Sequence, residues 1–312
     1  MLKVVFMGTP EFSLPALRAV AGAHQVVAVY TQPDRPVGRG LEVRYSPVKQ
    51  AALDLGLPVF QPEKLSDVGE IEKLRALQAD VMVVVAYGQI LKRAVIEMPR
   101  LGCINIHSSL LPRWRGAAPI QRAMLAGDAE TGVTTMLIAE KLDAGDILLQ
   151  KHTPIAADET AQTLHDRLAS LGGELILPTL AGRADGSLQA QKQDEAKVTY
   201  AAKLTKELER LNPVGSDAAS LDRQVRALNP WPGTSVTLTT GERLKIKRAA
   251  LRRDVTGGAG TLFEKQGQVF LGASDGALEL VRVQWDGKKE VDSSAFLNGI
   301  RGAGLKLPLQ LA

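Results

Sequence analysis

Short apolar runs alternate with amphipathic helical stretches over the first 180 residues, and this alternation limits the possible folds more than any other feature of the sequence. The runs are rich in Val, Ile and Leu, as is usual for strands that are covered on both faces. The runs occupy residues 3–7, 26–31, 58–61, 81–87, 103–107 and 133–138, and the main helical stretches occupy residues 47–55, 71–77, 117–125 and 160–180. Strands that alternate with helices predict an α/β fold with a Rossmann-like, doubly wound parallel sheet.

A different pattern occupies the C-terminal third of the chain. An amphipathic helical stretch is followed by short strand-like runs that are separated by glycine turns. The helical stretch covers residues 221–228, and the runs cover residues 235–239, 243–247, 260–264, 269–273 and 278–283. Their spacing predicts a small β-barrel. Because residues 184–203 are polar, we expect an α/β domain over residues 1–188, a linker over 189–208 and a barrel domain over 209–312.

Positive charge is concentrated in the second part of the chain. Residues 1–199 contain 21 Lys and Arg against 22 Asp and Glu, whereas residues 200–312 contain 17 against 12. Arg243, Lys245 and Lys247 alternate along one expected strand and therefore share a face. This excess suits a module that faces a polyanion, but a merely solvated basic surface would explain it as well. Charge alone does not identify a nucleic acid.

Cysteine usage and hydropathy exclude several classes of protein. Cys103 is the single cysteine, so the chain has no disulfide framework and no thiolate metal site, and we predict that it binds no metal. The strand pattern begins almost at the N-terminus, which leaves no room for a signal segment. No apolar run approaches the roughly 20 residues of a membrane-spanning helix. By elimination we expect a cytoplasmic protein.

The stretch from Gly102 to Gly116 contains the strongest candidates for chemistry. Asn105 and His107 lie two positions apart in a strand run, so their side chains point to one face, about 6–7 Å apart. The run then breaks, and ligand sites in open α/β sheets lie beyond the carboxyl ends of strands. An amide donor beside an imidazole suits acyl transfer, in which one group holds an oxyanion and the other handles an amine proton. For an isolated pair, a turn asparagine and a core histidine are the alternative.

Asp143 is a third candidate. It follows the apolar run 133–138 and begins a turn that contains glycine. An aspartate in this position can orient an imidazole and pair with its cation. The spacing in sequence does not show that Asp143 and His107 meet.

Several blocks of residues form a pattern that extends over nearly the whole chain. They are Met7-Gly8-Thr9-Pro10, Thr31-Gln32-Pro33-Asp34-Arg35-Pro36, Val84-Val85-Ala86-Tyr87-Gly88, Asn105-Ile106-His107, Ser109-Leu110-Leu111-Pro112, Arg115-Gly116-Ala117-Ala118-Pro119, Leu142-Asp143 with Gly145, and Asn229-Pro230-Trp231-Pro232. Together and in this order, the blocks resemble the signature of the folate-dependent formyltransferase family, and within it the enzymes that act on methionyl-tRNA. One departure is Ser108, where the family has a smaller residue, and it would narrow the pocket slightly.

The resemblance implies a reaction and a site. The reaction is transfer of the formyl group of 10-formyltetrahydrofolate to the amino group of methionine on initiator methionyl-tRNA. His107 would handle the proton, Asp143 would be its partner and Asn105 would be the oxyanion donor. The residues expected to line the folate pocket are Ala86, Tyr87, Gly88, Ser109, Leu110, Leu111 and Pro112.

The resemblance also implies contacts with the tRNA. The stretch between Thr31 and Pro47 is rich in Pro, Gly and Arg, and loops of this size are often functional, although it could also be a disordered surface loop. In the family, the corresponding insertion grips the acceptor end of the tRNA. The residues expected to contact tRNA are Arg39, Arg44, Lys203, Lys206, Arg210, Arg243, Lys245 and Lys247. We expect the protein to be a monomer and the C-terminal barrel to be of the oligonucleotide-binding kind.

Two other functions are compatible with parts of the sequence. The same chemistry could act on a small amine, such as an amino sugar or a purine precursor, but such an acceptor needs neither the basic module nor the arginine loop. A non-catalytic nucleic-acid-binding protein on an enzyme scaffold would not need Asn105, His107 and Asp143 together. A formylation assay with methionyl-tRNA and a panel of small amines separates the three hypotheses.

Overall fold

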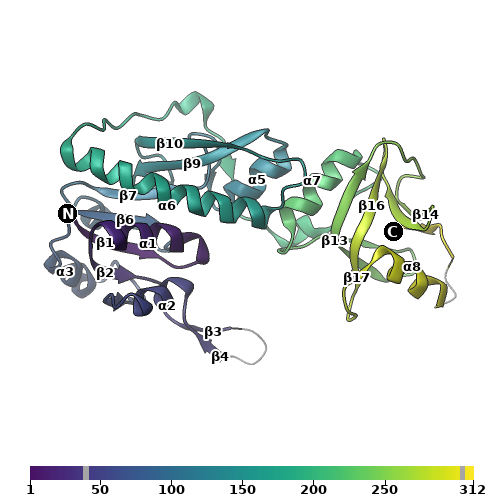
Figure 1. Ribbon diagram of the computed structural model, residues 1–312, viewed down its shortest axis with the longest axis horizontal. Coiled ribbons are helices and arrows are strands. Elements are labelled where there is room, and N and C mark those ends of the chain that lie inside the picture. The colour runs from purple at the N-terminus through teal and green to yellow at the C-terminus, as the bar shows by residue number, and fades with distance from the viewer. Residues whose placement is uncertain (38–41, 303–305) are drawn as a thin grey trace. The chain divides into compact units, whose positions relative to one another are not determined.

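Contacts between residues divide the chain into two compact units (Figure 1). The computed structural model describes residues 1–37, 42–302 and 306–312. The first unit contains Met1–Pro119, Glu130–Pro154 and His165–Ala201, and the second contains Ile120–Ala129, Ile155–Leu164 and Ala202–Ala312. Two short segments that precede Ala201 in the sequence thus belong to the second unit.

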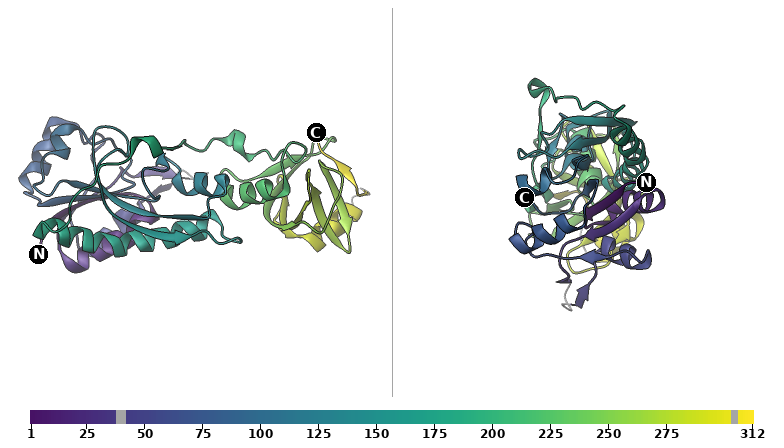
Figure 2. Two further views of the ribbon diagram at one scale, coloured as in Figure 1. Left: turned by 90° about the horizontal axis from the view of Figure 1, so that it is seen from above. Right: turned by 90° about the vertical axis from the view of Figure 1, so that its left-hand side faces the viewer.

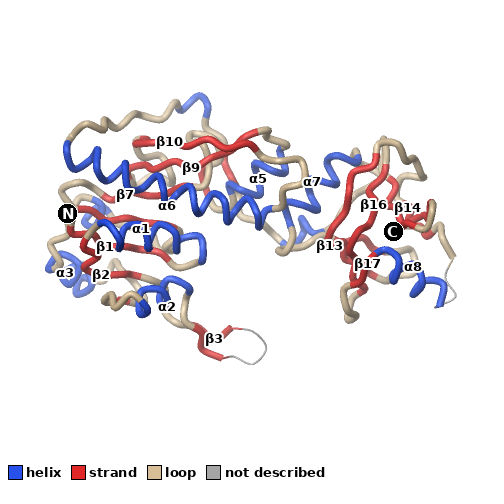
Figure 3. Tube along the Cα trace, viewed as in Figure 1, coloured by secondary structure: helices blue, strands red, loops and turns tan. Residues whose placement is uncertain are grey.

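A seven-stranded sheet forms the centre of the first unit, in the order β10-β9-β7-β6-β1-β2-β5 (Figure 3). Its strands are β1 (Lys3–Gly8), β2 (Gln25–Tyr30), β5 (Val59–Phe60), β6 (Val81–Val85), β7 (Cys103–His107), β9 (Glu130–Leu137) and β10 (Ile147–Pro154). The strands from β5 to β7 in this order are parallel, which confirms the predicted doubly wound sheet. β9 and β10 add an antiparallel edge. The sequence did not predict β10, because Gln150, Lys151 and His152 are exposed polar residues that interrupt its apolar pattern.

Helices cover both faces of this sheet. They are α1 (Leu14–Ala23), α2 (Pro47–Asp54), α3 (Val68–Ala76), α4 (Arg93–Ile96) and α6 (Ala161–Asp185), whereas α5 (Pro119–Ala126) belongs almost entirely to the second unit. On one face, Cys103 of β7 belongs to a buried cluster with Leu74 of α3 and Val95 of α4. On the other face, α1 and α6 lie side by side where Gly173 approaches Pro15 (Figure 1). The alternation of β7 therefore decides which of its side chains face α6 and which face away from it.

The chain after α6 stays with the first unit as far as Ala201. Gln191 forms a bridge with Ile147, and β11 (Tyr200–Ala201) pairs in parallel with β8 (Arg115–Gly116). A short 3-10 turn, η2 (Glu195–Lys197), lies between these two contacts. The first part of the stretch that the sequence predicts as a linker is therefore packed within the α/β unit.

The second unit is built on an antiparallel sheet in the order β12-β13-β16-β15-β14-β18, with β17 paired to β16. Its elements are η3 (Lys206–Glu209), α7 (Ala218–Leu228), β12 (Ser235–Thr237), β13 (Arg243–Arg252), β14 (Thr261–Lys265), β15 (Gln268–Gly272), β16 (Ala277–Trp285), β17 (Val291–Asp292), α8 (Ser293–Gly302) and β18 (Leu309–Gln310). Leu238 bridges Leu311, and the Thr239 N–H bonds to the carbonyl oxygen of Gln310, so the two ends of the sheet meet. The strands curve (Figure 2), and the main apolar cluster of this unit includes residues of α7 and α8, while Val255, Phe270 and Ala277 form a smaller one. The predicted small barrel is confirmed.

The helices of the described residues are all too short or too polar to cross a bilayer. α6 has 25 residues, but charged side chains occur along its length. This helix packs on the sheet through its apolar residues, among them Leu168, Ile176 and Leu180, which are fully buried.

Candidate active site

The carboxyl ends of β1, β6 and β7 lie at one edge of the parallel sheet. β1 has β2 on one side and β6 on the other, so the strand order reverses at β1. Ligand sites of open α/β sheets lie at such switch points. Thr9 follows β1 and donates a hydrogen bond of 3.0 Å to the carbonyl oxygen of Tyr87, which follows β6. His107 ends β7 at the same edge.

Asn105 and His107 share one face of β7. Ile106 lies against α6, where its side chain approaches Gly172, so the side chains of Asn105 and His107 lie on the opposite face. His107 is buried and Asn105 is half-buried. Within the described part of the chain, the Asn105 amide makes no hydrogen bond to another residue. Its two N–H groups can therefore serve a ligand.

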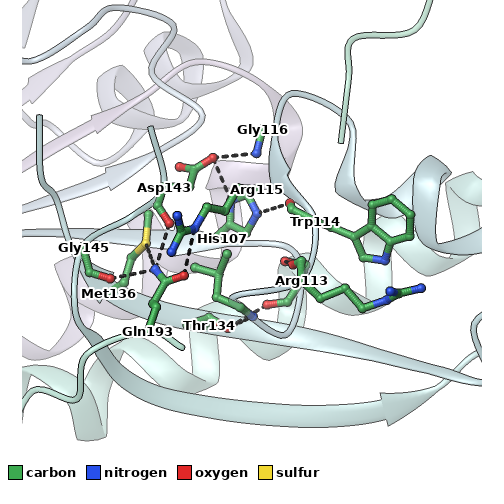
Figure 4. Close-up of polar contacts among 12 residues, drawn as sticks. His107, Arg113, Trp114, Arg115, Gly116, Thr134, Met136, Asp143, Gly145 and Gln193 are labelled. Carbon is green, nitrogen blue, oxygen red and sulfur yellow. Dashed lines mark hydrogen bonds and ion pairs between the residues drawn. The ribbon is translucent and has the colours of Figure 1, made fainter. Parts of the chain in front are cut away.

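The imidazole of His107 lies between a carbonyl and a carboxylate (Figure 4). Its Nε2 atom is 2.9 Å from the carbonyl oxygen of Trp114. Because a carbonyl can only accept, Nε2 must carry the proton. The neutral ring then has its lone pair on Nδ1, and Nδ1 is 3.8 Å from Oδ2 of Asp143. This tautomer makes Nδ1 the atom that can take a proton, and Asp143 the ion-pair partner of the ring once it has done so.

Asp143 lies in the turn between β9 and β10, and this turn folds back across the sheet. The turn begins beside the amino end of β7, where the Ile138 N–H bonds to the carbonyl oxygen of Cys103 at 2.8 Å. Asp143 nevertheless reaches His107 at the opposite end of β7. Its Oδ2 atom accepts a hydrogen bond of 2.8 Å from the Gly116 N–H. The structure therefore brings Asp143 to His107, and Asn105 lies two residues earlier on the same face of β7. The roles of the three residues stay predictions.

Close packing of Gly145 holds this turn in place. A Cβ atom added at Gly145 would lie 1.7 Å from the carbonyl oxygen of Leu137, at the end of β9. Only glycine allows the backbone to approach so closely. Asp143 itself has a φ of +46°, a left-handed conformation that a non-glycine residue adopts only where its surroundings hold it.

The first group of residues predicted to line the folate pocket follows β6. Ala86 and Gly88 are exposed and have φ values of +48° and +89°, so the chain turns sharply away from the sheet edge. Tyr87 lies between them and is only 2% exposed, because its ring packs into the core. Ala86 and Gly88 can offer a flat backbone surface to a ligand, whereas Tyr87 can offer backbone atoms alone.

The second group follows β7. Leu110 and Pro112 are half-buried, so part of each apolar side chain is accessible. Ser109 and Leu111 are buried, and the Ser109 hydroxyl donates to the carbonyl oxygen of Arg113 at 2.6 Å. Ser109 and Leu111 thus shape the loop, while Leu110 and Pro112 can form its surface. Apolar surface beside free backbone groups is the mixture that a flat heterocycle needs.

The residues predicted to contact tRNA fall in both units. In the first, Arg44 is exposed at the end of β4 (Glu42–Arg44), which pairs with β3 (Arg35–Val37), and Arg39 lies outside the described residues. In the second, Lys203 and Lys206 are exposed, and Arg210 donates to the carbonyl oxygen of Ala312 at 3.2 Å.

The basic face of β13 is partly neutralised by acidic residues of its own unit. Arg243, Lys245 and Lys247 alternate with the buried Leu244 and Ile246, as expected for one outward face. However, Arg243 pairs with Glu209 and Asp286, and Lys245 lies 2.8 Å from Asp286. The hydrogen bond from Lys245 lowers the pKa of Asp286. For Lys247, no ion pair is found in the described ranges. The three cations are therefore not equivalent.

Sequence reasoning missed a buried polar network beside Asp143. Arg115 has no exposed surface, its Nε donates to Gln193 Oε1 at 3.0 Å, and its Nη2 donates to Glu195 at 2.7 Å. The hydrogen bond from Arg115 lowers the pKa of Glu195. Arg115 belongs to one of the sequence blocks that carry the family resemblance. Gln193 and Glu195 lie in a polar stretch that resembles a linker, and only their contacts with Arg115 reveal that it is packed.

Across the described residues, no three of His, Cys, Asp and Glu come together as a metal site would require.

Comparisons with known proteins agree with this architecture. The pattern of the formyl transferase family matches residues 2–180, and that of the formyl transferase C-terminal domain matches residues 203–301. The methionyl-tRNA formyltransferase of Methylococcus capsulatus is 49% identical over 98% of this chain and 99% of its own length. The chain belongs to the methionyl-tRNA formyltransferase family. The enzyme of this name from Marinobacter nauticus is 46% identical over 99% of both chains.

Solved structures with low sequence identity share the fold of the formyltransferase family. An N-formyltransferase from Helicobacter canadensis, in complex with folinic acid and dTDP-3-aminofucose, has a TM-score of 0.68. It is 18% identical, and the match covers 90% of this chain and 99% of that one. HypX from Aquifex aeolicus, in complex with tetrahydrofolic acid, has a TM-score of 0.65 at 18% identity over 99% of this chain and 50% of its own. Family membership confirms the sequence-based resemblance and excludes a non-catalytic scaffold protein.

Proposed function

We propose that this protein transfers the formyl group of 10-formyltetrahydrofolate to the amino group of methionine on initiator methionyl-tRNA. The observation that supports the proposal is that Asp143 faces Nδ1 of His107 at the carboxyl edge of the sheet, while Asn105 shares a face of β7 with His107. Full-length relatives that are 49% and 46% identical and named methionyl-tRNA formyltransferase support this acceptor over a small amine.

Each of the three side chains has a distinct task in such a transfer. The attacking amine becomes positively charged as its nitrogen bonds to the formyl carbon, so a base must remove a proton from it. Nδ1 of His107 holds the lone pair that can do this, and Asp143 then pairs with the ring cation. The Asn105 N–H groups can hold the oxygen that gains negative charge, an interaction worth about 3 kcal/mol in a comparable acyl transfer. His107 can return the proton to the leaving nitrogen.

The residues after β6 and β7 fit a folate. Ala86 and Gly88 expose backbone, and Leu110 and Pro112 expose apolar surface at the same edge of the sheet. When bound, 10-formyltetrahydrofolate supplies the formyl group and the nitrogen that leaves. His107 ends β7 at the same edge, and Asn105 lies two residues before it on the same face of the strand. We therefore place the pterin against Ala86, Gly88, Leu110, Pro112 and the backbone of Tyr87, while Ser109 and Leu111 hold the loop that carries them.

We assign tRNA contacts to both units. Arg44, at the end of β4, belongs to the same unit as His107, and we propose that it reads the acceptor end together with Arg39, which lies outside the described residues. Lys203, Lys206, Arg210, Arg243, Lys245 and Lys247 belong to the second unit and suit the sugar–phosphate backbone. We further propose that the protein acts as a monomer in the cytoplasm, which light scattering and cell fractionation would test.

The decisive experiment offers the purified protein several acceptors with 10-formyltetrahydrofolate. We expect formylation of initiator methionyl-tRNA, slower formylation of elongator methionyl-tRNA, and none of free methionine or of a nucleotide-linked amino sugar. Activity should persist after treatment with a metal chelator. Preferential formylation of the amino sugar would show that the acceptor is a small amine. His107→Ala is the control for enzyme-dependent transfer.

A further inference from the structure

The two residues that face the ring nitrogens of His107 share an unusual backbone conformation. Trp114, whose carbonyl oxygen is bound by Nε2, has a φ of +66°. Asp143, whose carboxylate faces Nδ1, has a φ of +46°. Non-glycine residues occupy this region only where other contacts stabilise it. The position of the imidazole therefore depends on whatever holds these two residues.

Thr199 holds Trp114. The Trp114 N–H donates to the Thr199 hydroxyl at 2.9 Å, and the next N–H, of Arg115, donates to the Thr199 carbonyl oxygen at 2.9 Å. Because β8 and β11 then continue as paired strands, Thr199 lies at the start of a short ladder. The ladder fixes the direction of the Trp114 carbonyl group, which is the group that sets the tautomer of His107.

Gln193 holds the turn of Asp143. Its side-chain nitrogen donates to the carbonyl oxygens of Asp143, at 2.8 Å, and of Gly145, at 2.7 Å (Figure 4). The orientation of the amide is settled by Arg115, because a guanidinium only donates and therefore faces the Gln193 oxygen. Gln193 is 9% exposed and Arg115 is fully buried, so water competes little with these bonds.

We propose that Gln193 and Thr199 are positioning residues that set the tautomer and orientation of His107 through Asp143 and Trp114. Both residues lie in the segment that follows α6. Within this segment Gln193 contacts Asp143 and Thr199 contacts Trp114, the two residues that face the ring nitrogens of His107. The inference rests on the proposed function, because it takes His107 as the proton-handling group. It predicts that loss of either bond slows proton transfer without weakening the binding of either substrate.

The first test compares two substitutions of Thr199. Thr199→Val keeps the shape but removes the acceptor of the Trp114 N–H, whereas Thr199→Ser keeps the hydroxyl. We expect kcat for formylation of methionyl-tRNA to fall about 10- to 100-fold in Thr199→Val, with KM for both substrates within about twofold of wild type. Thr199→Ser should restore most of the rate. Equal rates for Val and Ser, close to wild type, would overturn the role of the hydroxyl.

The second test uses two glutamines four positions apart. Gln193→Met removes the bonds to the Asp143 turn, and we expect a similar fall in kcat at unchanged KM. Gln189→Met is the matched control, because Gln189 is exposed and its amide donates only to the carbonyl oxygen of Gly186 at 3.2 Å. This control should keep wild-type kinetics. If both methionine variants behave alike, Gln193 has no positioning role.

A third measurement separates this inference from the proposed function. In ¹⁵N-histidine NMR of the substrate-free protein, His107 should carry its proton on Nε2. Thr199→Val should populate the Nδ1–H tautomer, because Nε2 loses its fixed acceptor. Gln193→Met should keep the Nε2–H tautomer but shift the Nδ1 signal, because Asp143 no longer faces that atom. His107→Ala assigns the signal. If wild type fails to formylate methionyl-tRNA but the tautomer still changes, the function is wrong and the positioning stands. A fall in kcat with an unchanged ring would refute the positioning, and if Thr199→Val does not fold, Gln193→Met carries the test.

Discussion

The Oδ2 atom of Asp143 lies 3.8 Å from Nδ1 of His107 and accepts a 2.8 Å hydrogen bond from the Gly116 N–H. One oxygen is thus held by the backbone while it faces the ring. The carboxylate stays in place whether or not Nδ1 carries a proton. This arrangement suits a group that stabilises a transient imidazolium and does not itself give up or take the proton.

We predict that Asn105→Ala, His107→Ala and Asp143→Ala each lower kcat by at least about two orders of magnitude. The three substitutions remove, in this order, the oxyanion donor, the base and the ion-pair partner of the base. The variants should stay folded, as judged by circular dichroism and thermal unfolding. Because the groups act together, the His107→Ala/Asp143→Ala double variant should be little worse than His107→Ala alone. Additive losses would show that Asp143 acts independently of the ring.

Gly145→Ala should damage both stability and activity. The new Cβ would lie 1.7 Å from the Leu137 carbonyl oxygen, so the turn must move and carry Asp143 away from His107. We expect the free energy of unfolding to fall by about 1–3 kcal/mol, as for other overpacked sites, together with a lower kcat. Gly22→Ala in α1 is the control, since no atom lies within 4 Å of its added Cβ. It should unfold at the same or a higher temperature, and a harmless Gly145→Ala would mean that the turn tolerates displacement.

Tyr30→Phe should reduce the loss of stability at alkaline pH. Burial, with a smaller contribution from Glu70, raises the pKa of Tyr30 from 10.0 to about 12. Between these values the unfolded chain has lost a proton that the folded chain keeps. The free energy of unfolding therefore falls as pH rises, with a slope approaching about 1.4 kcal/mol per pH unit. Phenylalanine removes the contribution of Tyr30 to this slope, whereas Tyr87 and Cys103, whose pKa values are also raised by burial, keep theirs.

At pH 7 the same substitution should be neutral or stabilising by up to about 1 kcal/mol, because the buried Tyr30 hydroxyl is without a hydrogen-bond partner in the described structure. Urea unfolding at pH 7, 9 and 11 measures both effects. Tyr200→Phe is the matched control, since Tyr200 is 59% exposed. A clear destabilisation of Tyr30→Phe at pH 7 would reveal a hydrogen bond to an internal water molecule.

Lys247→Ala should reduce both the affinity for tRNA and its salt dependence more than Lys245→Ala does. Lys247 has no acidic partner among the residues described, so its loss should reduce the slope of log K against log salt by about one. Lys245 is 2.8 Å from Asp286 and must leave it to reach a phosphate, so its slope change should be smaller. Filter binding at several salt concentrations measures the slopes. If the slope of log K against log salt is the same for wild type and Lys247→Ala, Lys247 contacts no phosphate, and the basic face of β13 is only a solvated surface.

The sequence predicted those features that depend on local periodicity. The parallel sheet follows from apolar runs between helices, and the shared face of Asn105 and His107 follows from their spacing of two. The approach of Asp143 to His107 does not, because it depends on a turn that folds back over the whole length of β7. Such a path is fixed by close contacts, such as that of Gly145 with Leu137, that leave no pattern along the chain.

Polar contacts between segments that are distant in sequence are the second kind of feature that the sequence did not predict. Residues 191–201 read as a linker because they are polar, yet Gln193 is buried by a pairing with Arg115, which lies far from it in sequence. The basic pattern of β13 was read correctly as a face, but the acidic partners of Arg243 and Lys245 come from Glu209 and Asp286. Side chains that satisfy one another across the fold are visible only in three dimensions.

The interleaving of the two units has a consequence for how such an enzyme can be altered. Ile120–Ala129 and Ile155–Leu164 belong to the second unit, where Arg226 donates to the carbonyl oxygen of Glu159 at 2.8 Å. A gene fusion with one junction near Ala201 would therefore replace only the C-terminal part of the second unit. The foreign barrel would then have to pack with Ile120–Ala129 and Ile155–Leu164 of the original chain. Exchanging the second unit with that of another transferase therefore requires three coordinated replacements, over Ile120–Ala129, Ile155–Leu164 and Ala202–Ala312.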